Sequence, residues 1–151
     1  MATPSVTPSI EDPHNVLLRR LGAAGLLPFM GLALLVWLVE PDLQAWAAMA
    51  MAAYAALVVS FLGGIHWGAM WAKQQGDTAP VWWGIAPCLL AWPGVLMPPH
   101  AGLPWLGLLL VACYLVDRKL YPALGLSAWL TMRFRLSAVA ALSCFIAAGA
   151  L

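Results

Sequence analysis

The chain has 151 residues, of which 64% are hydrophobic and 9% charged, and its formal net charge is +1. Soluble globular domains carry about 25% charged residues, so a chain this short and this apolar is expected to lie in a membrane as one compact domain. It contains no basic run of the kind that binds nucleic acid. We therefore expect no nucleic-acid partner.

The first 16 residues are rich in Pro, Ser and Thr and carry Glu11 and Asp12. They have neither the apolar nor the Arg-rich amphipathic character of a targeting segment. We expect residues 1–16 to form a short disordered cytoplasmic tail, followed by a single transmembrane domain over residues 17–151.

Five apolar runs follow the tail, and each is predicted to be a membrane-spanning helix. The runs are Leu21 to Val39, Ala45 to Ala72, Pro80 to Met97, Gly102 to Val116 and Phe134 to Leu151. The expected fold is an all-α integral membrane protein with five transmembrane helices. Because Pro28, Pro87 and Pro93 remove backbone donors within these runs, we expect an irregular, closely fitted bundle.

The Lys and Arg residues all lie in alternate gaps between the apolar runs. They precede the first run, separate the second from the third, and separate the fourth from the fifth. The positive-inside bias therefore predicts a cytoplasmic N-terminus and an external C-terminus. The seven cations are Arg19, Arg20, Lys73, Arg118, Lys119, Arg133 and Arg135.

The connection between the fourth and fifth runs is long, and its middle is too apolar for a free loop. Its cations are grouped at its two ends. We expect residues 118–133 to form an interfacial segment, either a helix or a re-entrant piece, against the cytoplasmic leaflet.

The end of the second run reads Ser60-Phe-Leu-Gly-Gly-Ile-His-Trp-Gly68. Ser60, Gly64 and Gly68 repeat every four residues, and such a small-residue stripe lets another helix approach closely. Gly63 lies on a neighbouring face of the same helix. We predict that these four residues pack helices together.

His66 is the sole histidine within a predicted span and lies about seven residues, or ~10 Å, from Lys73 and the inner surface. An ionisable group at that depth is costly and marks a functional-site hypothesis. Two interpretations stay open: a neutral imidazole hydrogen-bonded between helices, or a group that handles a ligand or a proton. We expect no metal or cofactor. His66 and Cys113, which lies at a similar depth, would give zinc only two ligands, whereas zinc sites in proteins have three or four.

The predicted topology brings the inner ends of several spans together around His66. The ordinary interpretation of this region is an interfacial ion pair with a belt of aromatic residues. The functional interpretation is a pocket open to the inner leaflet, suited to an amphipathic ligand or a lipid head group. The candidate residues of that pocket are His66, Trp67, Trp71, Trp82, Trp83, Asp117 and Arg118.

Catalytic patterns are weak in this sequence. Ser60 and His66 diverge by about 240° around one helix, so they do not form a nucleophile and its base. Paired carboxylates within the membrane, phosphate-binding glycine loops and zinc-protease motifs are all missing from the sequence. We therefore expect the protein not to be an enzyme.

Several strings of residues resemble the bacterial membrane family catalogued as domain of unknown function 3429, which includes the mitochondrial transmembrane protein 69. They are Gly25-Leu-Leu-Pro-Phe29, Ser60-Phe-Leu-Gly-Gly-Ile-His-Trp-Gly68, Ala86-Pro-Cys-Leu-Leu-Ala-Trp92 and Asp117-Arg118. The resemblance implies a multi-pass protein of the bacterial inner membrane with a periplasmic C-terminus. It implies no activity. The tyrosine that the family tends to show before the last span is lacking between Trp129 and Arg133.

Two functions stay open at this stage. The first is a non-enzymatic accessory or packing component that binds a membrane-protein partner or a second copy of itself within the lipid bilayer. The alternative is a binder or proton-coupled carrier of a small amphipathic ligand of the lipid, quinone or porphyrin type, centred on His66. The alternative is an analogy to the tryptophan-rich sensory proteins, which are similar in span number and length and bind porphyrins and sterols.

Overall fold

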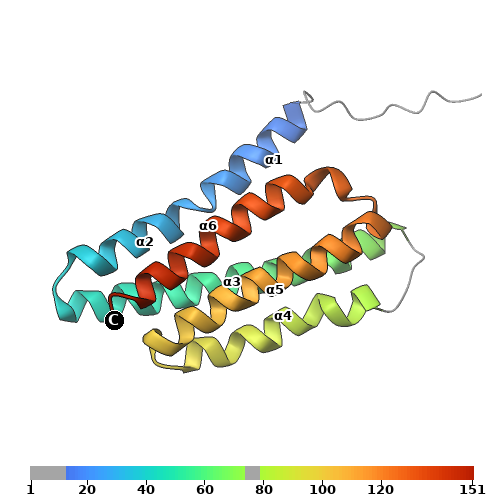
Figure 1. Ribbon diagram of the computed structural model, residues 1–151. Coiled ribbons are helices and arrows are strands. Elements are labelled where there is room, and N and C mark those ends of the chain that lie inside the picture. Colours follow the sequence, from blue (N-terminus) through green and yellow to red (C-terminus); the bar gives the residue numbers. More distant parts are fainter. Residues whose placement is uncertain (1–12, 74–78) are drawn as a thin grey trace, which may run out of the picture.

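The computed structural model describes residues 13–73 and 79–151, and it is helical throughout these ranges (Figure 1). In chain order the elements are α1 (Pro13–Ala24), α2 (Leu27–Leu38), α3 (Pro41–Lys73), α4 (Ala79–Leu96), α5 (Pro99–Leu124), the short 3-10 helix η1 (Ser127–Trp129) and α6 (Leu130–Ala148). The predicted all-α class is confirmed for the described residues. Of the predicted tail, residues 1–12 lie outside the described part, and residues 13–16 open α1.

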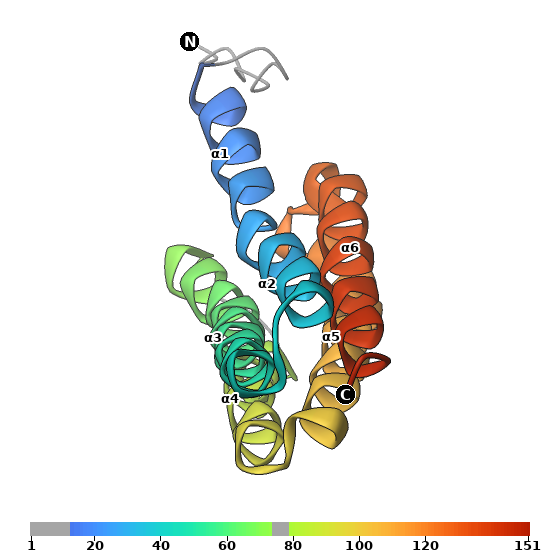
Figure 2. The same ribbon diagram turned by 90° about the vertical axis from the view of Figure 1, so that its left-hand side faces the viewer.

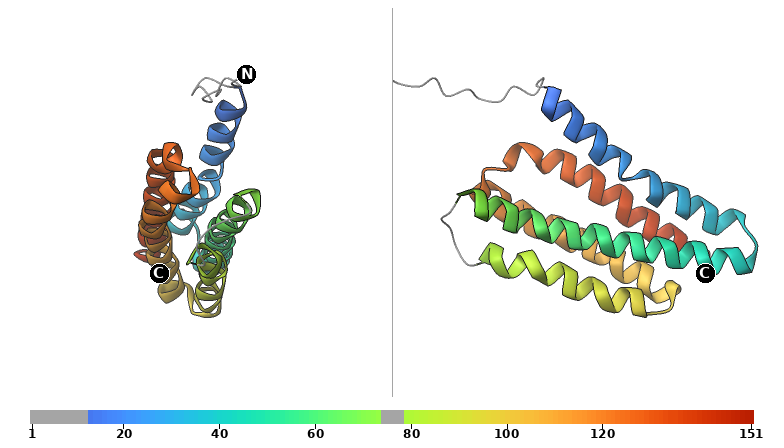
Figure 3. Two further views of the ribbon diagram at one scale, coloured as in Figure 1. Left: turned by 90° about the vertical axis from the view of Figure 1, so that its right-hand side faces the viewer. Right: turned by 180° about the vertical axis from the view of Figure 1, so that it is seen from behind.

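Five helices form a bundle with their long axes roughly aligned. Viewed along the bundle, α2 lies between α3 and α6, while α4 and α5 close the opposite side, and α1 diverges from the rest (Figure 2). The view from behind shows α3 and α4 side by side in front of α5 and α6 (Figure 3). The network described below lies between α3, α5 and α6.

Four stretches of the described chain are long and apolar enough to cross a membrane. They are Pro13–Leu38, Pro41–Ala72, Pro99–Leu124 and Ser127–Ala148. The third predicted run contains a shorter apolar helix, Val81–Leu96. The chain is therefore a multi-pass helical membrane protein.

The first of these stretches is broken in its middle. α1 ends at Ala24 and α2 begins at Leu27, with Pro28 in its first turn. A proline supplies no backbone N–H, so a break in the membrane needs a substitute donor from a neighbour. Tyr54 of α3 supplies one, because its hydroxyl donates to the carbonyl oxygen of Gly25 at 2.9 Å.

Tryptophan indoles make similar links between helices. Each of three indole N–H groups donates to a backbone carbonyl of another helix, and two of them bond to the proline-containing helix α4. The pairs are Trp37 with Ile146 at 3.0 Å, Trp67 with Val81 at 2.8 Å and Trp105 with Leu90 at 2.8 Å. These hydrogen bonds hold α2 to α6, α3 to α4 and α5 to α4.

Gly63 is the packing glycine of α3. A methyl group added there would lie 2.5 Å from the carbonyl oxygen of Gly84 and 3.3 Å from Cδ of Pro87. Both neighbours belong to α4, so the backbones of the two helices are in contact at this point.

Within the described residues, Gly64 and Gly68 of the predicted stripe have no helix packed against them. An added methyl group at Gly64 or Gly68 would meet nothing within 4 Å, and both glycines are exposed. The hydroxyl of Ser60 donates back to the carbonyl of Ala56 in its own helix at 2.8 Å. The stripe faces outward because α4 packs on the face of α3 that carries Gly63.

The predicted interfacial segment 118–133 is not a separate element. α5 continues without a break to Leu124, and Gly125, at φ 75°, ends it in the left-handed conformation that glycine adopts readily. Tyr121 and Leu124 are buried at 1% and 8% exposure. Two of the apolar residues that suggested an interfacial helix, Tyr121 and Leu124, therefore pack inside the bundle.

We predict that Gly63→Ala destabilises the protein by about 1–3 kcal/mol, because the added methyl group must displace the backbone of α4. Gly64→Ala is the matched control, since its methyl group meets open space and alanine is the better helix former. Thermal unfolding in detergent measures both variants. A Gly63→Ala protein as stable as the control would contradict the close contact.

Candidate functional site

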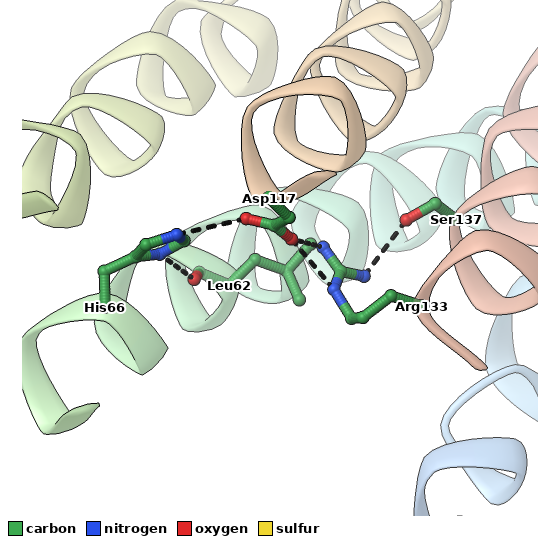
Figure 4. Close-up of polar contacts among 5 residues, drawn as sticks. All are labelled: Leu62, His66, Asp117, Arg133 and Ser137. Carbon is green, nitrogen blue, oxygen red and sulfur yellow. Dashed lines mark hydrogen bonds and ion pairs between the residues drawn. The ribbon is translucent and has the colours of Figure 1, made fainter. Parts of the chain in front are cut away.

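Charged and polar side chains from three helices meet inside the bundle (Figure 4). His66 comes from α3, Asp117 from α5 and Arg133 from α6. His66 and Asp117 are 0% exposed, and Arg133 is 8% exposed. Ionisable groups so deep in a membrane protein are costly and are held only when they are paired.

Asp117 and Arg133 form the central ion pair. Nε and Nη2 of Arg133 both donate to Oδ2 of Asp117, at 2.9 and 2.5 Å. Nη1 of the same guanidinium donates to the hydroxyl of Ser137 at 3.0 Å. Because Arg133 bonds to one carboxylate oxygen only, the other oxygen of Asp117 is left to face α3.

That second oxygen, Oδ1 of Asp117, lies 3.2 Å from Nε2 of His66. On the other side of the ring, Nδ1 of His66 lies 3.3 Å from the carbonyl oxygen of Leu62. Both atoms that face the imidazole are acceptors. A neutral ring carries one N–H and can donate to only one of them, whereas a protonated ring can donate to both.

The contact between His66 and Asp117 is close but incomplete. Neither Nε2 of His66 nor Oδ1 of Asp117 has a hydrogen-bond partner of good geometry. The 3.2 Å separation shows proximity, and the angular mismatch shows that the bond is poorly aligned.

Tyr121 completes the cluster from α5. Its side chain is 1% exposed, its ring centroid lies 5.8 Å from that of His66, and its hydroxyl interacts with Asp117 and Arg133. Tyr121 follows Asp117 by four residues, so both side chains project from the same face of the helix. The same four-residue spacing places Arg133 and Ser137 together on α6.

The structure forms two pairs among the predicted site residues: His66 with Asp117, and Trp67 with Trp71, whose ring centroids lie 6.1 Å apart. His66 and Asp117 are neighbours. Arg118 is exposed, and Trp71 and Trp82 are each 75% exposed. Consecutive residues of a helix point about 100° apart, so Arg118 cannot share the buried direction of Asp117.

Trp67 and Trp83 also serve other contacts. Trp67 donates its indole N–H to α4, and its ring fills the space above Gly84. Trp83 is half-buried and packs against the core. Trp67 and Trp83 therefore contribute to the packing of α4 against the rest of the bundle.

Arg133, Tyr121 and Ser137 are site residues that were not predicted. Arg133 was assigned to the inner surface with the other cations, because it precedes the last apolar run. A buried Asp117 needs a positively charged partner, and this requirement could have pointed to Arg133. Tyr121 lay in the segment assigned to the interface.

A cavity of about 780 Å³ lies beside this network. It is lined by α1, α2, α3, α5 and α6 and is mostly apolar, with Arg133, Ser137 and Tyr121 among its polar lining residues. Tyr54 and the Gly22 to Gly25 segment line it near the break between α1 and α2. Arg133 thus joins the buried ion pair to the cavity, while His66 lies behind it.

The arrangement can hold a charge or a proton. Ser137 is bonded to a guanidinium rather than to a base. Within residues 13–73 and 79–151, no group of three or more His, Cys, Asp and Glu side chains is placed to hold a metal ion.

Comparisons with known proteins agree with the sequence resemblance. The family model described as a protein of unknown function (DUF3429) matches residues 15–149. Transmembrane protein 69 of Xenopus tropicalis is similar, at 38% identity over 80 residues that cover 50% of this chain and 31% of that protein. The chain thus aligns with about a third of that relative's length. No solved structure matches the chain.

We predict that Asp117→Asn destabilises the protein by about 3–5 kcal/mol, because it leaves Arg133 buried without a counter-charge. The double variant Asp117→Leu with Arg133→Met removes both charges, and we expect it to recover at least half of the lost stability. Arg118→Ala is the control and should change stability by less than about 0.5 kcal/mol, since Arg118 is exposed. Unfolding in mixed micelles measures all three. A double variant no more stable than Asp117→Asn alone would rule out the ion pair as the cause.

Proposed function

This chain belongs to a family of proteins of unknown function, DUF3429, and we propose from its site that it binds a small amphipathic ligand within the membrane. The cavity beside Arg133 carries this proposal. Its volume of about 780 Å³ lies within the ~300–1,000 Å³ of small-molecule sites. An apolar lining with a few convergent polar groups is the usual character of such sites.

The position of the cavity supports a ligand that comes from the bilayer. It lies against α1 and α2, where the first stretch is broken and α1 diverges from the bundle (Figure 2). The residues around it include Leu57 and Phe61, which are each 69% exposed on the outer surface of α3. An alkyl chain or a ring system can enter between such residues from the lipid without passing through water.

The role of the protein in this proposal is binding rather than catalysis. Arg133, Asp117 and Ser137 already bond to one another. No side chain in this set is paired as a nucleophile with its base. We accordingly propose that the protein is not an enzyme and that it needs no metal or cofactor.

A second candidate function is that of an accessory component bound to another membrane protein or to a second copy. One observation favours it: the stripe of Ser60, Gly64 and Gly68 is not used inside the chain, and Gly64 and Gly68 are exposed. Small residues on an outer face allow a close approach by another transmembrane helix. The stripe and the cavity residues Leu57 and Phe61 all lie on α3. Ligand binding and binding of a membrane partner could therefore both involve this helix.

We also propose that the chain crosses the inner membrane of a bacterium five times, with a cytoplasmic N-terminus and a periplasmic C-terminus. In this topology α4, which is shorter than the four long apolar stretches, also crosses the membrane, between α3 and α5. A short helix can cross where the bilayer thins or where neighbouring helices shelter its ends. The distribution of cations supports this direction. Lys73 ends α3, Arg118 and Lys119 lie near the end of α5, and Arg135 lies near the start of α6.

This topology predicts the activity of reporter fusions. Alkaline phosphatase fused after Leu151 should be active, because the enzyme folds only outside the cytoplasm, and a fusion at residue 76 should be inactive. A fluorescent protein that folds only in the cytoplasm should give the reverse pattern at the same positions. Equal phosphatase activity at both positions would contradict an odd number of crossings between the two sites.

The ligand proposal predicts that filling the cavity removes the bound molecule. Val58 lines the cavity and is half-buried, so Val58→Trp should occupy its space. Val95→Trp, on the exposed surface of α4, is the matched control. Wild type and both variants are purified gently from native membranes, and everything retained is identified by mass spectrometry.

We expect one amphipathic molecule in stoichiometric amount with wild type and with Val95→Trp. Folded Val58→Trp should retain less than about a tenth of it, because losing the ligand's apolar contacts with the cavity weakens binding by at least ~1.4 kcal/mol. A stoichiometric protein partner, retained equally by all three, with no small molecule would support the accessory function and overturn the ligand proposal.

A further inference from the structure

We infer that the ligand carries one negative charge and that its binding is coupled to proton uptake between His66 and Asp117. This inference rests on the proposed ligand cavity and adds the chemical class of its occupant. The charges of the network, the acceptors around the imidazole and the position of Arg133 in the lining of the cavity support it.

The charge of the network depends on a single proton. The carboxylate of Asp117 and the guanidinium of Arg133 cancel, because two hydrogen bonds join them directly. With a neutral imidazole the network therefore has no net charge. One additional proton at the contact between His66 and Asp117 gives it a charge of about +1.

The surroundings of His66 provide a place for that proton. Acceptors face both ring nitrogens, Leu62 at 3.3 Å and Asp117 at 3.2 Å. The protonated ring satisfies both acceptors, and the neutral ring satisfies one. Nε2 of His66 and Oδ1 of Asp117 are buried polar atoms without a well-aligned hydrogen bond, and a shared proton resolves both.

Few other charged or titratable groups of the described residues face His66. From α5 these are Asp117, the hydroxyl of Tyr121 and the buried thiol of Cys113, which lies near Asp117 and Arg133, and from α6 the guanidinium of Arg133. Within the described part of α4, the titratable side chain is Cys88, which is exposed. The net charge around the imidazole is therefore set by Asp117 and Arg133, which cancel.

A buried net charge of about +1 within a membrane bundle is costly unless an anion accompanies it. Arg133 is placed to hold that anion, because it both belongs to the network and lines the cavity. A guanidinium has five N–H groups. The hydrogen bonds to Asp117 and Ser137 use one on each nitrogen. The hydroxyl of Tyr121 bonds to one of the two N–H groups that remain, which leaves one N–H for an anion.

An anionic head group at Arg133 and a proton at His66 therefore stabilise each other. Each adds a charge that cancels the other, so binding of one increases the affinity for the other by the same factor. The apolar remainder of the cavity suits an alkyl chain. The occupant is accordingly a single-chain amphipathic anion taken from the bilayer, such as a long-chain carboxylate.

The test uses two probes of equal chain length on the purified full-length protein in detergent micelles. Hexadecyl sulfonate keeps its negative charge at every pH used, and hexadecanol is neutral. We expect the affinity for the sulfonate to rise about tenfold from pH 8 to pH 6, within the range of ordinary coupling energies. The affinity for hexadecanol should stay constant.

His66→Gln should bind the sulfonate with the same affinity at both pH values, because the amide cannot take up the proton. His100→Gln is the matched control: His100 is exposed at the start of α5, so this variant should keep the tenfold change. A His66→Gln protein that keeps the pH dependence would overturn the inference.

A second measurement uses only the wild-type protein and does not depend on the variant folding. Calorimetric titration with hexadecyl sulfonate at pH 7, in two buffers of different ionisation enthalpy, counts the protons taken up. We expect uptake of up to one proton for each sulfonate bound, and no uptake with hexadecanol. Sulfonate binding without proton uptake would overturn the inference.

The two proposals fail in different ways. Equal binding of both probes at both pH values, lost in Val58→Trp, would overturn the coupled anion site and leave the ligand cavity intact. Failure of the folded wild-type protein to bind either probe, together with no retained small molecule in the purification, would overturn both.

Discussion

The arrangement of α3, α5 and α6 depends on the buried carboxylate of Asp117 and on the side chains that contact its two oxygens. A fully buried carboxylate in a membrane protein needs a counter-charge, and Arg133 supplies it through two hydrogen bonds to a single oxygen. The second oxygen is then left to His66 on α3. One carboxylate therefore contacts side chains of two other helices, so a change at Asp117 affects the relative positions of all three.

Irregular backbone is the second constraint on this bundle, and it creates the cavity. The first stretch is interrupted beside Gly25, whose carbonyl takes a hydrogen bond from Tyr54. Beyond this break α1 diverges, and the space it leaves is bordered by Arg133 of the ion pair. In lipid, a broken helix is tolerated where a neighbour satisfies the freed backbone group. The break between α1 and α2, which Tyr54 supports, therefore borders the cavity that Arg133 also lines.

The network also bears on the two interpretations of His66 that the sequence left open. A neutral imidazole hydrogen-bonded between helices would be expected to face one donor and one acceptor, or to donate once to an acceptor. The ring instead lies between two acceptors, with its Nε2 poorly bonded. That geometry favours a group that gains a proton over one that serves packing alone. Packing between the helices is provided elsewhere, for example by the contact of Gly63 with Gly84.

Hydropathy and helix length follow from local composition, so the amino-acid sequence was enough to predict the helical class and the order of the apolar segments. It also placed Asp117 and His66 near the same end of the bundle. The partner of Asp117, the outward direction of Gly64 and Gly68, and the continuation of α5 to Leu124 were decided only by the tertiary structure. A helix shows which residues share a face, but not which face meets a neighbour. Arg133 is part of the ion pair because α6 packs beside α5, and no local pattern in the sequence fixes that packing.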